Sequence, residues 1–344
     1  MIATVKRVSS FSIAVCAVAI ILSILLATCI GAVGIAPSDV FASIAWHLRI
    51  PFTDQSVGTS DVIIWQLRLP RVILAFVVGS MLASAGAAYQ GTFRNPLADP
   101  YLLGVSAGAG LGATLIIVTG SNPNQYLVPF GSFLGAITAV ALTYTLGRSA
   151  IAGRSSTALI LAGVAVANLL TALQTLIQQQ HNDRIREVYS WVLGTLNTTG
   201  WSDVRLVTPY ICICLVVLYR YRRVLDVFGV GDEEAQTMGL PVERVRATVI
   251  IAASLGTAAA VSVTGLIGFV GVIVPHVLRL FVGNSFRILV PLSIVFGGIF
   301  LVFADLLART VLAPAEIPIG IVTALIGAPF FLYVLGSRRV GGIS

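Results

Sequence analysis

Long apolar runs separated by short polar segments dominate this chain. Ten runs can be marked, at 11–33, 69–91, 101–119, 126–146, 157–179, 205–219, 247–267, 268–283, 288–308 and 317–335. A helix needs about 20 apolar residues to cross the hydrocarbon core of a bilayer. The runs are continuous and lack the alternation that is typical of a membrane β-barrel. The pattern therefore predicts an all-α polytopic membrane protein, with ten transmembrane helices in one domain that covers residues 1–344.

The composition narrows the classes of protein that remain. Of the 344 residues, 57% are hydrophobic and 10% are charged, whereas a soluble domain has about 25% charged residues. This excludes a soluble enzyme and a disordered chain. The net charge of +7 comes from scattered arginines, which form no basic patch of the kind that binds nucleic acid. We expect the lipid bilayer as a partner, and no nucleic acid.

The distribution of basic residues predicts the orientation. An even number of spans places both termini on one side of the membrane. With cytoplasmic termini, 14 of the 21 lysines and arginines fall on the inside and 7 on the outside, as the positive-inside rule requires. Arg68, Arg71 and Arg309 belong to the outer set and need an explanation of their own.

Two apolar runs contain residues that disturb a helix. The run at 101–119 is rich in glycine, and the run at 268–283 contains Pro275. Non-helical backbone at membrane depth is tolerated where it is buried in protein or lines a wet cavity. Both runs are therefore expected to face a partner helix or a transport path. The four-residue spacing of Gly104, Gly108 and Gly112, repeated by Gly131 and Gly135, is that of close helix packing, either within one chain or against a second copy.

The segment 220–246 differs from the rest of the chain because it holds ten charged residues in 27 positions. Leu225–Phe228 and Ala235–Met238 are predicted to form two short helices, which the glycines at 229 and 231 separate. Asp232, Glu233 and Glu234 lie in the first turn of the second helix, where the helix dipole favours acids. The segment is either a solvated connection or a docking surface for a soluble partner. Docking is the interpretation we favour, because a connection has no need of two capped helices.

Residues for chemistry or ion coupling are scarce. The chain has no phosphate-binding Gly-x4-Gly-Lys-Ser/Thr motif, and His47, His181 and His276 lie apart from one another and from the cysteines. We therefore expect no catalytic residues, no metal site and no cofactor in this chain. Ionisable residues inside membrane spans are typical of ion-coupled carriers, yet Asp305 and Arg279 are the two that lie well inside a run. This disfavours a secondary transporter and favours an external energy source.

Seven stretches in order and spacing resemble one transport family. They are WQLRLPR at 65–71, YQGTFRNPLADP at 89–100, LGVSAGAG at 103–110, LAGV at 161–164, the loop 231–240, GLIGFVGVIVPHVLRL at 265–280 and EIPIGIVTALIGAPF at 316–330. Together they resemble the permease subunit of the ABC importers for iron-siderophores, haem and cobalamin. The resemblance covers about residues 60–335.

The resemblance implies an architecture and a set of partners. The fold would be that of a type II ABC importer permease, with ten spans per subunit and a path along the two-fold axis of a homodimer. Two ATP-binding cassette subunits would bind ATP and Mg on the inside. One periplasmic or lipid-anchored substrate-binding protein would dock outside. The location would be the cytoplasmic (inner) membrane of a bacterium or archaeon.

The resemblance also assigns roles to residues, each beside a simpler alternative. Arg68, Arg71 and Arg309 would pair with acids of the binding protein, unless they reach the membrane interface as snorkelling side chains. The coupling surface for the ATPase would be Leu225, Phe228, Asp232, Glu233, Glu234, Ala235, Met238, Gly239 and Leu240. The cytoplasmic gate would be Asn95, Leu97, Ser156 and Thr157, although the Asn-Pro pair at 95–96 also fits a plain turn.

The cargo stays open at this stage. A ferric siderophore is the first expectation, and cobalamin and haem follow. The competing classes are a secondary transporter, which the scarcity of intramembrane charge disfavours, and a membrane-embedded enzyme, for which no catalytic cluster can be identified.

Overall fold

The computed structural model describes residues 10–31, 33–50, 58–120, 125–149, 156–197, 200–229 and 231–340. Within these ranges the regular structure is entirely helical, which confirms the all-α prediction. The longer helices are α1 (Ser10–Cys29), α2 (Pro37–His47), α4 (Leu69–Thr92), α5 (Val105–Thr119), α6 (Leu127–Gly147), α7 (Ser156–Gln180), α8 (Ile185–Val192), α9 (Trp201–Phe228), α11 (Val242–Thr264), α12 (Val270–Val282), α13 (Phe286–Thr310) and α14 (Ile319–Val340). The short ones are α3 (Thr59–Val62), the π-helix η1 (Ile63–Arg68), the 3-10 helix η2 (Asn182–Arg184) and α10 (Asp232–Thr237).

Every predicted apolar run overlaps a helix. Among the described residues, seven helical stretches are long and apolar enough to cross a membrane: α1, the continuous stretch from α3 to α4, α6, α7, α9, α11 and α13. The helices α5, α12 and the described part of α14 are apolar but shorter. The structure thus supports seven spans by length. Pro275 lies inside α12 without ending it.

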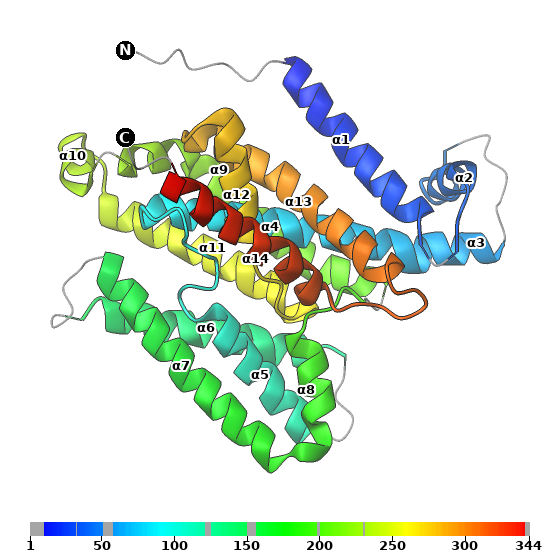
Figure 1. The fold of residues 1–344 in the computed structure, drawn as a ribbon, viewed down its shortest axis with the longest axis horizontal. Helices are drawn as coiled ribbons and strands as arrows, with labels where there is room; N and C mark the ends of the chain where they lie inside the picture. The colour runs from blue at the N-terminus through cyan, green and yellow to red at the C-terminus, as the bar shows by residue number, and fades with distance from the viewer. Residues whose placement is uncertain are drawn as a thin grey trace.

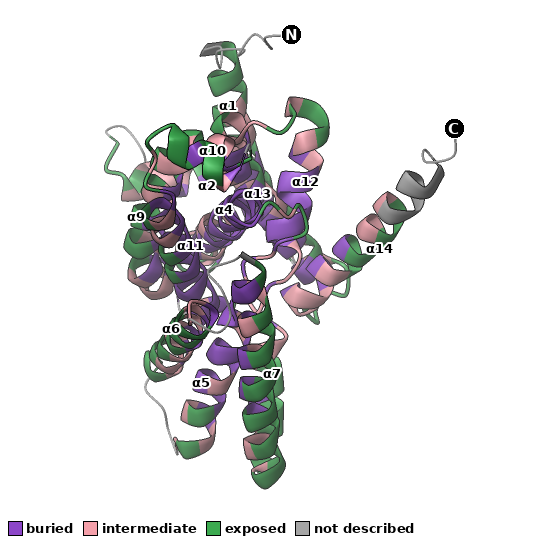
Figure 2. Ribbon diagram, turned by 90° about the vertical axis from the view of Figure 1, so that its left-hand side faces the viewer, coloured by how far each residue is buried: buried purple, intermediate pink, exposed green. Residues whose placement is uncertain are grey.

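Helix α4 forms the centre of the molecule. Of its 24 residues, 20 are buried, because small side chains such as Ala85 and Ala88 let neighbouring helices approach from all sides. Figure 2 shows α4 as a buried core, with exposed faces on α1, α7 and α9. Those outer faces are apolar and include Leu161 and Ile213. An apolar outer face suits contact with lipid.

Helices α5 to α8 form a second layer beside α11 (Figure 1). A Cβ atom on Gly108 would lie 2.3 Å from the carbonyl oxygen of Gly135, and one on Gly112 would lie 2.1 Å from that of Gly131. Both distances are far below van der Waals contact, so only glycine fits. The glycine repeats therefore pack α5 against α6 within one chain.

The ends of the molecule are formed by different elements. In Figure 1, α10 lies at one end, while α2 and α3 lie at the other. Helix α4 runs between them, and its 24 residues span about 36 Å at 1.5 Å per residue. One end carries the predicted docking residues, and the other carries the predicted coupling residues.

Candidate docking, coupling and gate sites

Charged side chains meet at the end of the molecule where α4 begins and α13 ends. The Arg71 guanidinium lies 2.9 Å from Asp305 Oδ1 and 2.9 Å from Glu316 Oε1. Arg309 Nε lies 3.4 Å from Asp305 Oδ2. Asp305 is therefore shared by two arginines, and Arg71 joins two carboxylates. The structure thus brings together residues that are more than 200 positions apart in the sequence.

Two arginines of this end, Arg68 and Arg309, donate hydrogen bonds to α1. Arg68 Nη1 donates hydrogen bonds to the carbonyl oxygens of Thr28 at 2.9 Å and Cys29 at 3.1 Å, and Arg309 donates to the carbonyl of Ala27. The last carbonyls of a helix lack intrahelical partners and carry partial negative charge. Arg68 and Arg309, exposed by 9% and 7%, therefore cap the end of α1. The sequence did not predict this role.

Gly31 allows both arginines to approach the end of α1. A Cβ atom on this residue would lie 2.7 Å from Arg68 Nη2 and 3.3 Å from Arg309 Nη1. A side chain at position 31 would therefore displace the guanidinium groups. This contact places Arg68 beside Arg309, and Arg309 shares Asp305 with Arg71, so all three predicted docking arginines lie in one cluster.

The acidic members of the cluster were not among the predicted site residues. Asp305 lies inside an apolar run, and a buried carboxylate requires a cationic partner. The four-residue spacing of Asp305 and Arg309 was the signal in the sequence. Glu316 begins the last recognised motif, two residues before Pro318, and its partner Arg71 could be found only from the tertiary structure.

At the opposite end, α10 is held by its first residue. Asp232 accepts two hydrogen bonds of 2.8 Å from Arg246 and a third from Arg94. The Arg246 guanidinium also lies 5.7 Å from the centre of the Phe228 ring. Because Arg94 follows α4 and Arg246 lies in α11, these contacts tie α10 to both helices.

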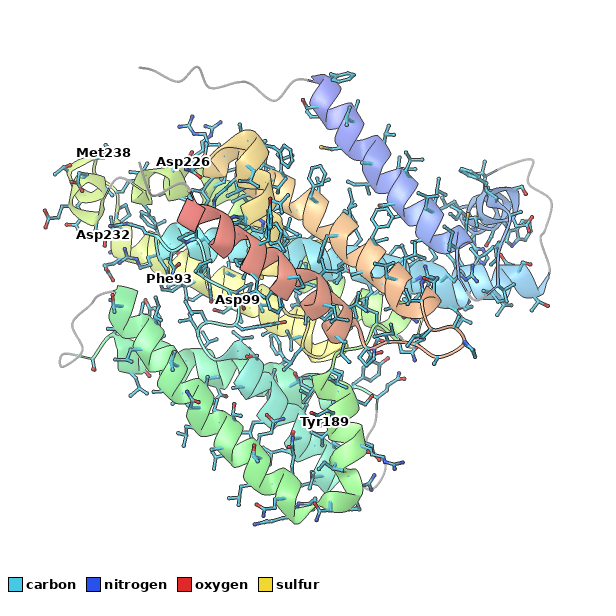
Figure 3. The ribbon with its side chains drawn as sticks, in the orientation of Figure 1. Phe93, Asp99, Tyr189, Asp226, Asp232 and Met238 are labelled. Carbon is cyan, nitrogen blue, oxygen red and sulfur yellow. The ribbon has the colours of Figure 1, made fainter. Side chains whose placement is uncertain are left out.

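The predicted coupling residues divide into buried and exposed groups. Leu225, Phe228 and Ala235 are fully buried, Asp232 and Leu240 are half-buried, and Glu233, Glu234, Met238 and Gly239 are exposed. The prediction of two short helices was partly wrong. Leu225–Phe228 is the last turn of the 28-residue helix α9, because α9 continues past the apolar run into polar sequence. Met238, with 64% exposure, lies beyond the end of α10 (Figure 3).

The last turn of α9 is joined to the start of α13. Asp226 Oδ2 accepts a hydrogen bond from Ser285 Oγ at 3.0 Å, and Oδ1 accepts one from the backbone N–H of Phe286. Arg287 Nε lies 3.5 Å from the same carboxylate. An acid at a helix N-terminus satisfies a free N–H and matches the dipole. The coupling end therefore includes α13.

The predicted gate residues lie on two elements. Asn95 Oδ1 accepts a hydrogen bond from the N–H of Leu97 at 2.9 Å, which fits the turn reading, and Leu97 is 53% exposed. Ser156 begins α7, but its side chain lies outside the described residues. Thr157 is exposed on the first turn of α7. Helix α7 packs on the loop that follows Leu97, since a Cβ atom on Gly163 would lie 2.3 Å from the carbonyl oxygen of Leu102.

The two disturbed runs meet at a cavity. Tyr101 Oη donates a hydrogen bond of 2.9 Å to the carbonyl of Ile267, which joins the loop 93–104 to the non-helical segment before α12. A cavity of 390 Å³ opens beside this contact, lined by Leu97, Asp99, Tyr101, Gly268, Phe269, Val272 and Phe331. Both non-helical segments therefore face protein and this cavity.

Asp99 places a carboxyl group on this otherwise apolar wall. It accepts a hydrogen bond from the N–H of Tyr101 at 2.8 Å, which favours the charged form. Burial is the larger effect and raises the pKa of Asp99 from 3.8 to about 6. The group therefore titrates close to neutral pH.

Comparison with known proteins identifies the family. Residues 19–337 match the model of the FecCD transport family. The chain belongs to this family. The match covers both charged clusters, the loop 93–104 and the cavity.

Several FecCD relatives are similar over most of their length. BtuC of Halobacterium salinarum, a cobalamin import system permease protein, is 44% identical over 283 residues, which cover 82% of this chain and 75% of BtuC. HmuU of Yersinia pestis, a hemin transport system permease protein, is 38% identical and covers 83% of this chain and 87% of HmuU. YfmE of Bacillus subtilis, an Fe(3+)-citrate import system permease protein, is 38% identical, and the alignment covers 80% of this chain and 82% of YfmE.

A solved structure supports the fold of this FecCD protein. It is described as an inward-facing conformation of a metal-chelate type ABC transporter. The TM-score is 0.83 at 27% identity, and the alignment covers 96% of this chain and 100% of the solved chain. The resemblance drawn from seven sequence motifs is thereby confirmed.

Proposed function

We propose that this chain is the transmembrane subunit of an ATP-driven importer, which moves a metal chelate from a substrate-binding protein into the cytoplasm. The observation that supports this most is the FecCD match over residues 19–337. Relatives named for cobalamin, hemin and Fe(3+)-citrate share a cargo chemistry, a metal held by an organic chelator. A ferric siderophore belongs to the same class.

The proposal includes a homodimer with ten spans per subunit. Helices α5, α12 and α14 supply the three spans beyond the seven that length alone supports. Helices α5 and α12 have 15 and 13 residues, and α14 has 22. The path runs near the two-fold axis, past the cavity beside Leu97 and Phe331.

The end with α10 faces the cytoplasm in this proposal, as do both termini. Arg94, Arg148, Arg246 and Arg287 form ion pairs there, which agrees with the positive-inside rule. Two ATP-binding cassette subunits dock on α10 through exposed Glu233, Glu234 and Met238. They bind the ATP and Mg, and we expect no cofactor or metal in this chain. The membrane is the cytoplasmic membrane of a bacterium or archaeon.

The end with Arg68, Arg71 and Arg309 faces outward and receives the binding protein. Helix α4 connects this end to Arg94 and therefore to α10 over a span of about 36 Å. ATP-driven closure of the cassettes shifts α10, and the helices tilt between outward-open and inward-open states. Asn95, Leu97, Ser156 and Thr157 close the cytoplasmic side.

Uptake by the reconstituted complex tests the function. The chain, its cassette subunit and its binding protein are placed in liposomes, and labelled ferric siderophore, cobalamin and hemin are offered in parallel with ATP inside. We expect ATP-dependent uptake of one of the three. The chain alone should hydrolyse no ATP. Uptake driven by an ion gradient without ATP would overturn the proposal in favour of a secondary transporter.

A further inference from the structure

The three outer arginines differ in what they contact. Arg68 and Arg309 donate to backbone carbonyls at the end of α1, where a partner protein could not replace those acceptors. Arg71 instead donates to the side chains of Asp305 and Glu316. Arg71 is therefore the arginine whose present acceptors resemble the acidic side chain of a docking partner.

The two acceptors of Arg71 are not equivalent. The Asp305 side chain is 1% exposed and is shared with Arg309. The Glu316 side chain is 42% exposed and lies in the non-helical connection between α13 and α14. Displacing Asp305 would leave a buried charge, which is costly. Displacing Glu316 would return its carboxylate to water.

The contact between Arg71 and Glu316 imitates an intermolecular ion pair. Arg71 Nη1 donates to Glu316 Oε1 at 2.9 Å and to Oε2 at 3.0 Å, so both carboxylate oxygens are engaged. A recess of 170 Å³ opens beside the pair and is lined by Arg71, Glu316 and polar residues that include Ser190, Thr195 and Asn197. A carboxylate from outside could enter there and take over the same donor.

We propose that Glu316 is a built-in competitor, which occupies Arg71 until a carboxylate of the binding protein displaces it. This inference rests on the proposed function, because it needs a docking partner on the outer end. Glu316 thereby limits the affinity of docking and favours release of the binding protein after each delivery. The exchange replaces one carboxylate with another on the same donor, so its free-energy change is small in either direction.

The expected magnitude follows from the exposure of Glu316, whose side chain is 42% exposed while that of Arg71 is 12% exposed. Solvent screens the carboxylate and weakens the pair, so removing the competitor should tighten docking by about twofold to fivefold. Glu316→Gln keeps the size of the side chain and removes its charge. Glu187→Gln is the matched control, because Glu187 also pairs with an arginine, Arg184, at 3.1 Å and is 57% exposed, yet lies on α8.

The experiment measures binding of the cognate substrate-binding protein to the full transporter in nanodiscs, by biolayer interferometry at fixed ionic strength. We expect a lower dissociation constant for Glu316→Gln, no change for Glu187→Gln, and loss of the gain when Arg71→Lys is added to Glu316→Gln. Cargo-free and cargo-loaded binding protein are both measured.

The outcomes separate this inference from the function on which it rests. If wild type binds and Glu316→Gln binds equally or more weakly, the competitor role is wrong and the importer function stands. Equal tightening by Glu187→Gln would also overturn the competitor role, since the effect would then come from removing any negative charge and not from freeing Arg71. If no form of the transporter binds the protein and none imports a chelate, the proposed function fails and the inference with it.

Discussion

Asp226 on the last turn of α9 accepts a hydrogen bond from Ser285, the residue before α13, at 3.0 Å. The same carboxylate receives the N–H of Phe286 and pairs with Arg287. Two helices that leave the membrane at one end are thus joined by a single side chain. Under the proposed function, a displacement of α10 is passed on to α13 through such contacts.

Replacing Asp226 with alanine should weaken the junction between α9 and α13. The free N–H of Phe286 loses its acceptor, and loss of a capping side chain costs about 1 kcal/mol. We expect lower thermal stability of the purified chain, and less uptake per ATP hydrolysed in the complex. Asp183→Ala serves as control, because Asp183 is 77% exposed and forms a longer 3.7 Å pair. Equal stability of both variants would contradict the role of Asp226.

Replacing Arg246 with alanine should loosen α10. Arg246 is 6% exposed and donates twice to Asp232, and hydrogen bonds between charged groups contribute about 1.5–3 kcal/mol. We expect hydrogen exchange of the amides at 232–240 to become about tenfold faster or more. Arg244→Ala is the control, since Arg244 is exposed on the same helix. Unchanged exchange in Arg246→Ala would show that α10 is held by other contacts.

Replacing Met238 with glutamate should separate the permease from its ATPase. Met238 is 64% exposed and lies on the surface that we propose binds the cassette subunit. We expect ATPase activity that no longer rises with cargo-loaded binding protein, while the chain keeps its melting temperature. Gln236→Glu adds the same charge on α10 and keeps Met238. If Gln236→Glu also loses coupling, the effect comes from the added charge and the role of Met238 is contradicted.

Replacing Arg68 with lysine should release the end of α1. One ammonium group cannot reproduce the forked contacts of Arg68 with the carbonyls of Thr28 and Cys29. We expect faster labelling of Cys29 by a maleimide, detected by mass spectrometry of its peptide. Arg205→Lys, on the exposed face of α9, should leave labelling unchanged. Weaker docking without faster labelling would favour a pure docking role for Arg68.

Asp99 gives the chain a pH-dependent stability. Burial raises its pKa to about 6 from 3.8, so the folded state binds the proton more tightly than the unfolded state. The stabilising contribution of the protonated form is therefore complete below pH 3.8 and is lost as the pH rises through about 6. Asp99→Asn should melt higher than wild type at pH 7.5, with a smaller difference at pH 4.5. A difference that does not change with pH would contradict this assignment.

The sequence determined the class of the protein, because long apolar runs can be buried only in lipid or against each other. It also determined where glycines allow close contact, and which segments carry the family motifs. The helix α10 was predicted from its acidic first turn. The separate short helix predicted at Leu225–Phe228 was wrong, because the polar sequence around Leu225 gave no sign that α9 continues to Phe228.

The tertiary structure decided which charges meet. Asp305 and Glu316 lie more than 230 positions from Arg71, and no spacing rule links such distant residues. It also decided that Arg68 and Arg309 are directed into the chain at the end of α1. A local pattern reflects interactions between neighbouring residues along a helix, whereas a buried ion pair depends on how separate helices pack, and that packing is a property of the whole fold.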